Sequence, residues 1–197
     1  MGIYLSLLVL HWESKLFAGS KDTNIVLTLK HENKGSGKMS YIELSEQKSC
    51  KNTIMIFAEG TILKPKAVLG LYDLNAYVPI GNCVEMISGW KEQGAEIVYC
   101  TSRRKKNVRE MADLLTQYGF PGTRVYYRSQ KQQYKDVVEE LRPTILIEDN
   151  CKSIGGVQQM CISSVDPEIK ETIKSVSVDE FKGIDRLPRS FADLFNL

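Results

Sequence analysis

The sequence is poor in the side chains that most often act as metal ligands and nucleophiles. It has two histidines, His11 and His31, and five cysteines, an odd number that includes no Cys-x-x-Cys pair. This pattern argues against a disulfide framework and a zinc site, and it is typical of a reducing compartment, so we expect a cytoplasmic protein. Because both histidines precede residue 50, whereas Cys100 and Cys151 lie far along the chain, a Cys-His nucleophile is not expected.

A charge excess and long apolar runs are also missing. The formal net charge is +2, so no global basic field favours nucleic acid as a partner. No apolar run reaches the ~18 residues that a membrane-spanning helix needs, so we expect no membrane contact. Residues 3–10 are apolar but have no basic segment before them, and we do not interpret them as a secretory signal. The composition, 43% hydrophobic and 25% charged, is that of a soluble globular protein.

Residues 1–50 differ from the rest of the chain and form an N-terminal arm. Residues 3–10 and 24–29 are short β-like runs, and residues 34–38 have the composition of a flexible polar linker. Two interpretations of the arm stay open. Residues 1–38 are a poorly ordered extension of the gene model, with Met39 as the start, or the arm is a small β-hairpin packed on the main domain. In neither case do we expect it to carry chemistry.

From Thr53 onward, short apolar runs alternate with segments of helical periodicity. The predicted strands are residues 53–57, 96–100, 124–127, 144–147 and 160–163. The predicted helices are residues 81–93, 105–118, 130–141 and 153–159. Such alternation with short links predicts that residues 51–197 form an α/β domain, a three-layer Rossmann-like parallel sheet with helices on both faces. A sheet of this kind binds ligands at the carboxyl ends of its strands.

Residues 59–80 break this rhythm, because the segment is longer than a strand-to-helix link usually is. We therefore predict a small cap-like insert over residues 58–80, after the first core strand. Two interpretations of its side chains stay open. In one, Tyr72, Asp73 and Tyr77 close over a ligand, and in the other they pack as an aromatic loop.

Polar side chains follow several predicted strands in a fixed order. Residues 57–62 read Phe-Ala-Glu-Gly-Thr-Ile, residues 97–103 read Ile-Val-Tyr-Cys-Thr-Ser-Arg, and residues 145–150 read Ile-Leu-Ile-Glu-Asp-Asn. A lysine near the start of the helix at residues 130–141 lies between the last two segments. In this order they resemble the four motifs of the haloacid dehalogenase-like superfamily, whose first motif is Asp-x-Asp-Gly-Thr. The resemblance covers about residues 53–165.

The resemblance implies a phosphatase-type hydrolase that uses Mg²⁺ and acts on a small phosphorylated molecule, with a nucleotide as one candidate. Transfer of a phosphoryl group needs fixed donors and positive charge, and Mg²⁺ prefers carboxylate oxygens. The corresponding positions are Glu59 and Lys135 for catalysis, with Lys131 as the alternative lysine; Gly60, Thr61, Thr101, Ser102 and Arg103 for phosphate; and Glu148 and Asp149 for the metal.

The first motif departs from the pattern at the position of the nucleophile. Phe57 replaces the first aspartate, and because its ring has no oxygen, it can neither attack phosphorus nor bind a metal. Glu59 keeps a carboxylate at the acid/base position. Two functions follow. Either a phosphomonoester is hydrolysed, by a metal-activated water with Glu59 as general base or by a different, recruited nucleophile, or the domain is inactive and binds a phosphate, a nucleotide or a protein partner.

Several of these residues also have a simpler structural explanation. Thr101 and Ser102 can cap the helix that follows them, and Lys135 can be a solvated helix residue. Residues 103–106 form the densest basic cluster, Arg-Arg-Lys-Lys, at a helix N-terminus whose dipole favours anions. The cluster invites an anionic ligand beside Thr101. It is the only support for a third function, nucleic-acid end processing, which we rank last.

Overall fold

The computed structural model describes residues 24–34, 37–47, 52–67, 73, 76–122 and 124–197, and residues 24–47 are described by their backbone alone. The chain divides into two compact units, Met1–Ser49 and Cys50–Leu197. Across the described ranges, no helix is long and apolar enough to cross a membrane.

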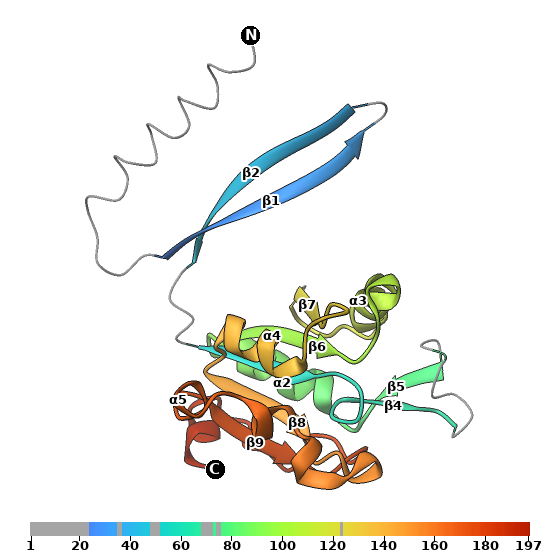
Figure 1. The fold of residues 1–197 in the computed structure, drawn as a ribbon. Coiled ribbons are helices and arrows are strands. Elements are labelled where there is room, and N and C mark those ends of the chain that lie inside the picture. The colour runs from blue at the N-terminus through green and yellow to red at the C-terminus, as the bar shows by residue number, and fades with distance from the viewer. Residues whose placement is uncertain (1–23, 35–36, 48–51, 68–72, 74–75, 123) are drawn as a thin grey trace. The chain divides into compact units, whose positions relative to one another are not determined.

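The first unit contains an antiparallel hairpin (Figure 1). Strand β1 (Asn24–Lys34) pairs with β2 (Gly37–Gln47) along its whole length, with Asn24 opposite Gln47. The flexible linker predicted at residues 34–38 is wrong where the structure describes it, because Lys34 ends one strand and Gly37 begins the other. The β-like run at residues 24–29 lies in β1, and the run at residues 3–10 lies outside the described residues.

The second unit is built on a sheet whose described strands are all parallel and lie in the order β7-β6-β3-β8-β9 (Figure 1). Their bounds are β3 (Thr53–Phe57), β6 (Glu96–Thr101), β7 (Arg124–Tyr127), β8 (Ile145–Asp149) and β9 (Lys174–Val178). The chain runs outward from β3 to β7 and then returns to β8, on the other side of β3. This reversal is the topological switch point at which α/β sheets bind ligands. The predicted α/β, Rossmann-like sheet is confirmed.

Helices cover both faces of this sheet, since successive side chains of a strand point to opposite faces. Ile54 and Ile56 of β3 pack with α2 (Cys83–Glu92) and α3 (Val108–Gln117), while Met55 packs with α4 (Tyr134–Leu141). The short α5 (Pro167–Lys170) precedes β9. After β9 the chain returns to α2, where the Trp90 indole donates a hydrogen bond to the carbonyl of Pro188 at 2.9 Å. The sheet is thus the middle of three layers.

The segment between β3 and α2 contains a second antiparallel pair, β4 (Leu63–Pro65) and β5 (Tyr77–Pro79). Tyr77, one of the three side chains predicted to close over a ligand, begins β5 and is buried. Tyr72 lies outside the described residues. The role of residues 58–80 as a cap stays a prediction.

The segment after β8 differs from its prediction. The predicted strand at residues 160–163 is wrong, because Cys161–Ser164 forms a 3₁₀ turn whose first backbone N–H groups bond a carboxylate instead of a neighbouring strand. The predicted helix at residues 153–159 is two 3₁₀ turns, Lys152–Ile154 and Gly156–Gln159, interrupted at Gly155 with φ of 130°. The last strand of the sheet is β9.

Candidate functional site

A cavity of about 230 Å³ lies at the carboxyl edge of the sheet, where the strand order reverses around β3. Most of its lining follows the ends of β3, β6, β8 and β9. The described carboxylates that line it are Glu59, Glu148, Asp149 and Glu180, and the described aromatic rings are Phe57, Tyr77, Tyr134 and Phe181. No described residue of the lining is Lys or Arg. The cavity is therefore acidic and aromatic.

Glu59 occupies the centre of a donor group at the end of β6. The hydroxyl of Thr101 donates to Oε1 at 2.8 Å, the hydroxyl of Ser102 donates to Oε1 at 2.9 Å, and the N–H of Ser102 donates to Oε2 at 3.1 Å. Thr101 is fully buried. The three donors therefore fix the position of the Glu59 carboxylate.

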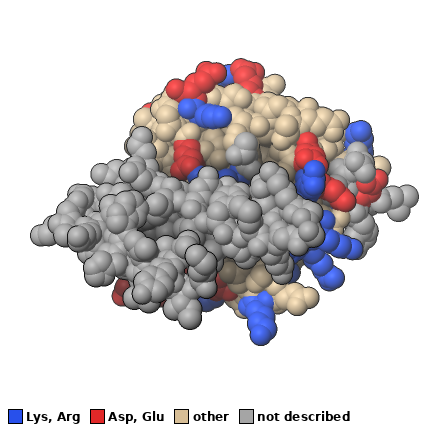
Figure 2. All heavy atoms as spheres, turned by 90° about the horizontal axis from the view of Figure 1, so that it is seen from above, with Lys and Arg blue, Asp and Glu red and all other residues tan. Residues whose placement is uncertain are grey.

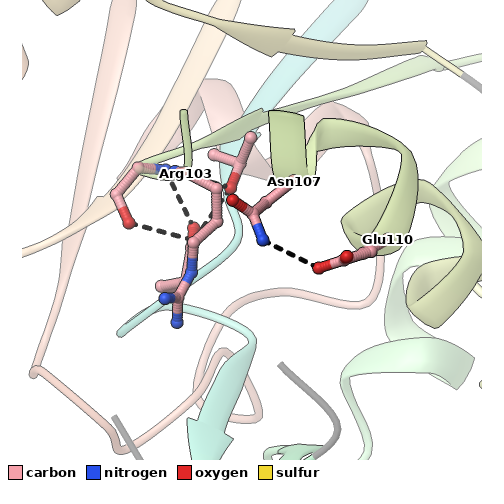
Figure 3. A network of polar contacts seen from close by, with 6 residues as sticks. Arg103, Asn107 and Glu110 are labelled. Carbon is pink, nitrogen blue, oxygen red and sulfur yellow. Dashed lines mark hydrogen bonds and ion pairs between the residues drawn. The ribbon is translucent and has the colours of Figure 1, made fainter. Parts of the chain in front are cut away.

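Arg103 adds a positive charge to the same carboxylate. Its Nε lies 3.2 Å from Oε1 of Glu59, and its guanidinium lies over the ring of Tyr77, 5.1 Å from the centroid. Figure 3 shows that Arg103 and Asn107 point in different directions, with Asn107 reaching Glu110 of α3 and donating to its Oε2 at 2.8 Å. Arg103 therefore pairs with the Glu59 carboxylate and packs over the Tyr77 ring.

Glu148 lies in β8 and is only 3% exposed. Its carboxylate accepts the N–H of Cys161 at 2.7 Å and the N–H of Ile162 at 3.0 Å. Burial raises the pKa of Glu148 from 4.5 to about 7, against the two N–H groups, which lower it. A buried carboxyl that titrates near neutral pH is a candidate for proton transfer.

Asp149 is the last residue of β8, and its side chain lies close to residues 60 and 61 of the first motif. Its Oδ1 accepts the N–H of Cys151 at 2.8 Å, and its Oδ2 lies 3.5 Å from the hydroxyl of Thr61. Burial raises its pKa. Gly60 has φ of +84°, and a Cβ at this position would meet Oδ2 of Asp149 at 2.4 Å. The close approach of β8 to the first motif thus depends on glycine at residue 60.

The aromatic part of the wall joins β3 to α4. The rings of Phe57 and Tyr134 contact edge to face, with centroids 5.4 Å apart and an interplanar angle of 78°. The guanidinium of Arg128, which follows β7, lies over Tyr134 at 5.0 Å from the centroid. Burial raises the pKa of Tyr134 to about 12, so its hydroxyl keeps its proton. Phe57 is therefore a wall side chain.

The structure brings together some of the predicted site residues. Glu59, Gly60, Ser102, Glu148 and Asp149 line the cavity. Thr61, Thr101 and Arg103 contact a lining carboxylate without being part of the lining. Neither predicted lysine is among the described lining residues: Lys135 is half-buried in α4, and Lys131 is exposed.

The remaining members of the basic cluster face solvent. Arg104, Lys105 and Lys106 are exposed, unlike Arg103. On the described part of the face shown in Figure 2, both signs of charge are present: Asp and Glu side chains lie among Lys and Arg side chains at the top, and several Lys and Arg side chains lie together at the lower right. The predicted cluster thus separates into one inward-facing arginine and three solvated cations.

The donor set does not fit the Mg²⁺ that the motifs imply. Within the described part of the chain, no group of three or more His, Cys, Asp or Glu side chains is placed to hold a metal ion. Phe57 contributes no oxygen at the position where the first motif would supply a ligand. Glu148 and Asp149 are in addition bonded to backbone N–H groups. We therefore derive no step through a metal.

The cysteines near the cavity are unsuited to nucleophilic attack. Burial raises the pKa of Cys151 to about 12 and also raises the pKa values of Cys100 and Cys161. The thiolate, which is the nucleophilic form, is therefore scarce at neutral pH. The side chains of Cys151 and Cys161 line the cavity. Their backbone N–H groups donate hydrogen bonds to the carboxylates of Asp149 and Glu148, respectively.

Sequence reasoning missed Tyr134, Glu180 and Phe181. Tyr134 was within reach, because it lies near the start of a predicted helix at the edge where the motifs meet. Glu180 and Phe181 follow β9, which the sequence pattern did not indicate as a strand. Glu180 accepts hydrogen bonds from the N–H and hydroxyl of Ser153, which ties this edge of the cavity to the segment after β8.

Comparisons with known proteins find similar solved structures at low sequence identity. No family model and no curated protein sequence matches this chain. A class C acid phosphatase from Bacillus anthracis has a TM-score of 0.48 at 11% identity, over 76% of this chain and 79% of that one. An uncharacterized protein from Listeria monocytogenes serotype 4b has a TM-score of 0.46 at 12% identity, over 74% and 99% of the two chains. A D,D-heptose 1.7-bisphosphate phosphatase from B. bronchiseptica, complexed with magnesium and phosphate, has a TM-score of 0.39 at 7% identity, over 66% and 94%. At these values the likenesses do not assign a function, which has to come from the site itself.

Proposed function

We propose that the unit Cys50–Leu197 is a non-hydrolytic, ligand-binding domain of the haloacid dehalogenase-like type. The observation that carries this proposal is the position of the Glu59 carboxylate, which accepts hydrogen bonds from Thr101 and Ser102. The motif resemblance assigns these donors to the phosphate of a substrate. In this domain they bind the chain's own carboxylate, so the place of the phosphate is taken.

Electrostatics supports the same proposal. A phosphate in the cavity would lie beside Asp149, while Arg103, whose Nε lies 3.2 Å from Glu59, is already paired with that carboxylate. Two like unit charges 4 Å apart repel by about 4 kcal/mol at an effective dielectric constant of 20. The small phosphorylated molecule or nucleotide expected from the motifs is therefore a poor match for this cavity.

The residue at the nucleophile position also supports a non-hydrolytic domain. Phe57 has no atom that can form a phosphoenzyme, and its ring packs against Tyr134. The described cysteines of the lining do not replace it, since Cys151 and Cys161 keep their protons, and the hydroxyl of Ser102 is donated to Glu59. A phosphoenzyme at residue 57 is thus excluded, which supports a binding role for the cavity.

Glu148 favours a second candidate, a phosphomonoester hydrolase without a covalent intermediate. Its pKa of about 7 allows it to take a proton from water at neutral pH. This route still needs a site for the phosphate that Glu59 does not obstruct. We rank it second for that reason.

Phosphate release from a panel of phosphomonoesters, nucleotides included, separates the two candidates. The panel is run with Mg²⁺ or EDTA on the full chain, on Glu148→Gln, and on Glu92→Gln, which changes an exposed residue of α2. The proposal predicts no release above buffer from any of the three. Release that is lost in Glu148→Gln and kept in Glu92→Gln would overturn it and establish the hydrolase.

A further inference from the structure

The cavity combines carboxylates with aromatic rings, and this chemistry selects one class of ligand. We propose that it binds a small alkylammonium cation. The inference rests on the proposed function, since it names the ligand of the same cavity. A positive charge is attracted to the carboxylates of the lining. Alkyl groups on the charged nitrogen pack against aromatic faces by cation–π attraction.

The rings of the cavity already accept cations from the chain itself. Arg103 lies over Tyr77 and Arg128 lies over Tyr134, each with its guanidinium carbon about 5 Å from the ring centroid. Attraction of a cation to a ring face operates within about 6 Å. Phe57, in edge contact with Tyr134 at 78°, adds a second ring orientation to the wall. These guanidinium groups take up one face of Tyr77 and of Tyr134, so a further cation would use the remaining ring surface of the wall, including Phe57 and Phe181.

The carboxylates are fixed before any ligand arrives. Glu59 is held by Thr101 and Ser102, and Glu180 is held by the N–H and hydroxyl of Ser153. Side chains that are already positioned lose little freedom on binding, which favours affinity.

The size and rim of the cavity restrict the ligand further. Its volume of about 230 Å³ is smaller than that of most sites for drug-sized molecules, which begin near 300 Å³. Ile154 lines the cavity yet is 67% exposed, so it lies at the rim. A compact ammonium head group fits the interior, and an apolar substituent would contact Ile154.

Other ligand classes match less well. An anion is repelled by the carboxylates, and a bare divalent ion finds no group of three ligands among the described residues. A neutral apolar molecule would use the rings and gain nothing from the carboxylates. The useful comparison is therefore between an ammonium ion and a neutral molecule of the same shape.

Calorimetric titration of the full chain with tetramethylammonium and choline tests the inference. The neutral probe is 3,3-dimethyl-1-butanol, in which carbon replaces the choline nitrogen. We expect choline to bind with a dissociation constant of about 1 mM or tighter, and the neutral probe to bind at least about tenfold more weakly. Equal binding of the two probes, or no binding of either ammonium ion, would overturn the inference.

Variants assign the binding to the cavity. Tyr134→Leu removes a ring and Glu180→Gln removes a charge, and each should weaken choline binding several-fold. Phe195→Leu and Glu92→Gln make the same changes at exposed residues outside the described lining and should leave it unchanged. Circular dichroism checks that each variant is folded. Equal loss in the cavity variants and the control variants would place the ammonium elsewhere.

The phosphate-release panel keeps the two proposals separate. If neither ammonium binds and no phosphate is released, the inference fails and the non-hydrolytic domain stands. If phosphate is released, the non-hydrolytic domain fails, and the titration still decides whether the cavity takes an ammonium ion.

Discussion

The hydroxyl of Thr101 donates to the carboxylate of Glu59 at 2.8 Å, although 42 residues separate the two in sequence. Thr101 ends β6 and Glu59 follows β3, and these strands are parallel neighbours. Because the carboxyl ends of parallel neighbours share one edge of the sheet, the topology itself brings acceptor and donor together. A carboxylate that follows β3 can therefore accept hydrogen bonds from donors at the end of β6, which would otherwise face the cavity.

Removing the Glu59 carboxylate should destabilise the domain. In Glu59→Ala, the buried Thr101 hydroxyl and the Arg103 guanidinium lose a partner, and we expect the free energy of unfolding to fall by about 2–4 kcal/mol. Urea unfolding followed by circular dichroism measures it. Glu92→Ala, at an exposed helix position, should change stability by less than about 0.5 kcal/mol. Equal effects in the two variants would show that the Glu59 contacts contribute nothing.

Gly60→Ala should cost more than the same change at a glycine of similar backbone conformation. Its new Cβ would meet Asp149, whereas Gly156, with φ of +81°, has nothing within 4 Å of a Cβ. Strain alone predicts a loss of about 1–2 kcal/mol for Gly156→Ala. The added clash predicts about 3 kcal/mol or more for Gly60→Ala. Similar losses of unfolding free energy in the two variants, measured by urea titration, would mean that Asp149 does not clash with a Cβ at residue 60.

Stability should depend on pH through Glu148. Its pKa is about 7 in the folded chain against an ordinary value of 4.5, so the folded chain binds this proton more tightly than the unfolded chain does. The stability from this proton is complete below pH 4.5 and is lost as the pH rises through about 7.

Comparison with Glu148→Gln isolates this effect, because Gln does not titrate. From about pH 5 to about pH 8, the unfolding free energy of the native chain should fall by about 2.5 kcal/mol relative to that of the variant. Urea titrations at several pH values give the difference. A difference that is flat with pH, or that rises, would show that the pKa of Glu148 is not raised.

Much of the fold followed from local patterns. Four of the predicted strands match β3, β6, β7 and β8 to within about two residues, since each is a short apolar run after a turn signal. The fifth was misplaced. Lys174–Val178 reads Lys-Ser-Val-Ser-Val, with too few apolar residues to indicate a buried strand, whereas Met160–Ser163 is more apolar. Residues 160–162 of that second segment are buried because they pack against the rest of the domain and because Glu148 accepts hydrogen bonds from two of their N–H groups.

The candidate site followed from the sequence only in part. The order of the motifs brought Glu59, Thr101 and Asp149 to one edge, because strand ends meet there. It did not show that Glu59 would turn onto Thr101 and Ser102, since that depends on side-chain rotamers and on which donors have other partners. Nor did it identify Glu180, which follows the strand that was missed.

Restoring an aspartate at residue 57 should not create a phosphatase. Phe57→Asp loses the contact with Tyr134 and adds a carboxylate to an acidic cavity, so we expect a stability loss of about 2–4 kcal/mol. We also expect no phosphate release with Mg²⁺, since Glu59 still holds the donors. The phosphomonoester panel, run on the folded variant, measures it. Metal-dependent release would mean that the catalytic arrangement is intact and lacks only the nucleophile.

Binding of inorganic phosphate tests the central claim, that Glu59 takes the place of an anion. Phosphorus NMR would titrate the native chain, Glu59→Ala and Glu92→Ala, each first shown to be folded. We expect phosphate to bind only to Glu59→Ala, because that variant frees the Thr101 and Ser102 donors together with Arg103. Phosphate binding to the native chain at least as tightly as to Glu59→Ala would contradict it.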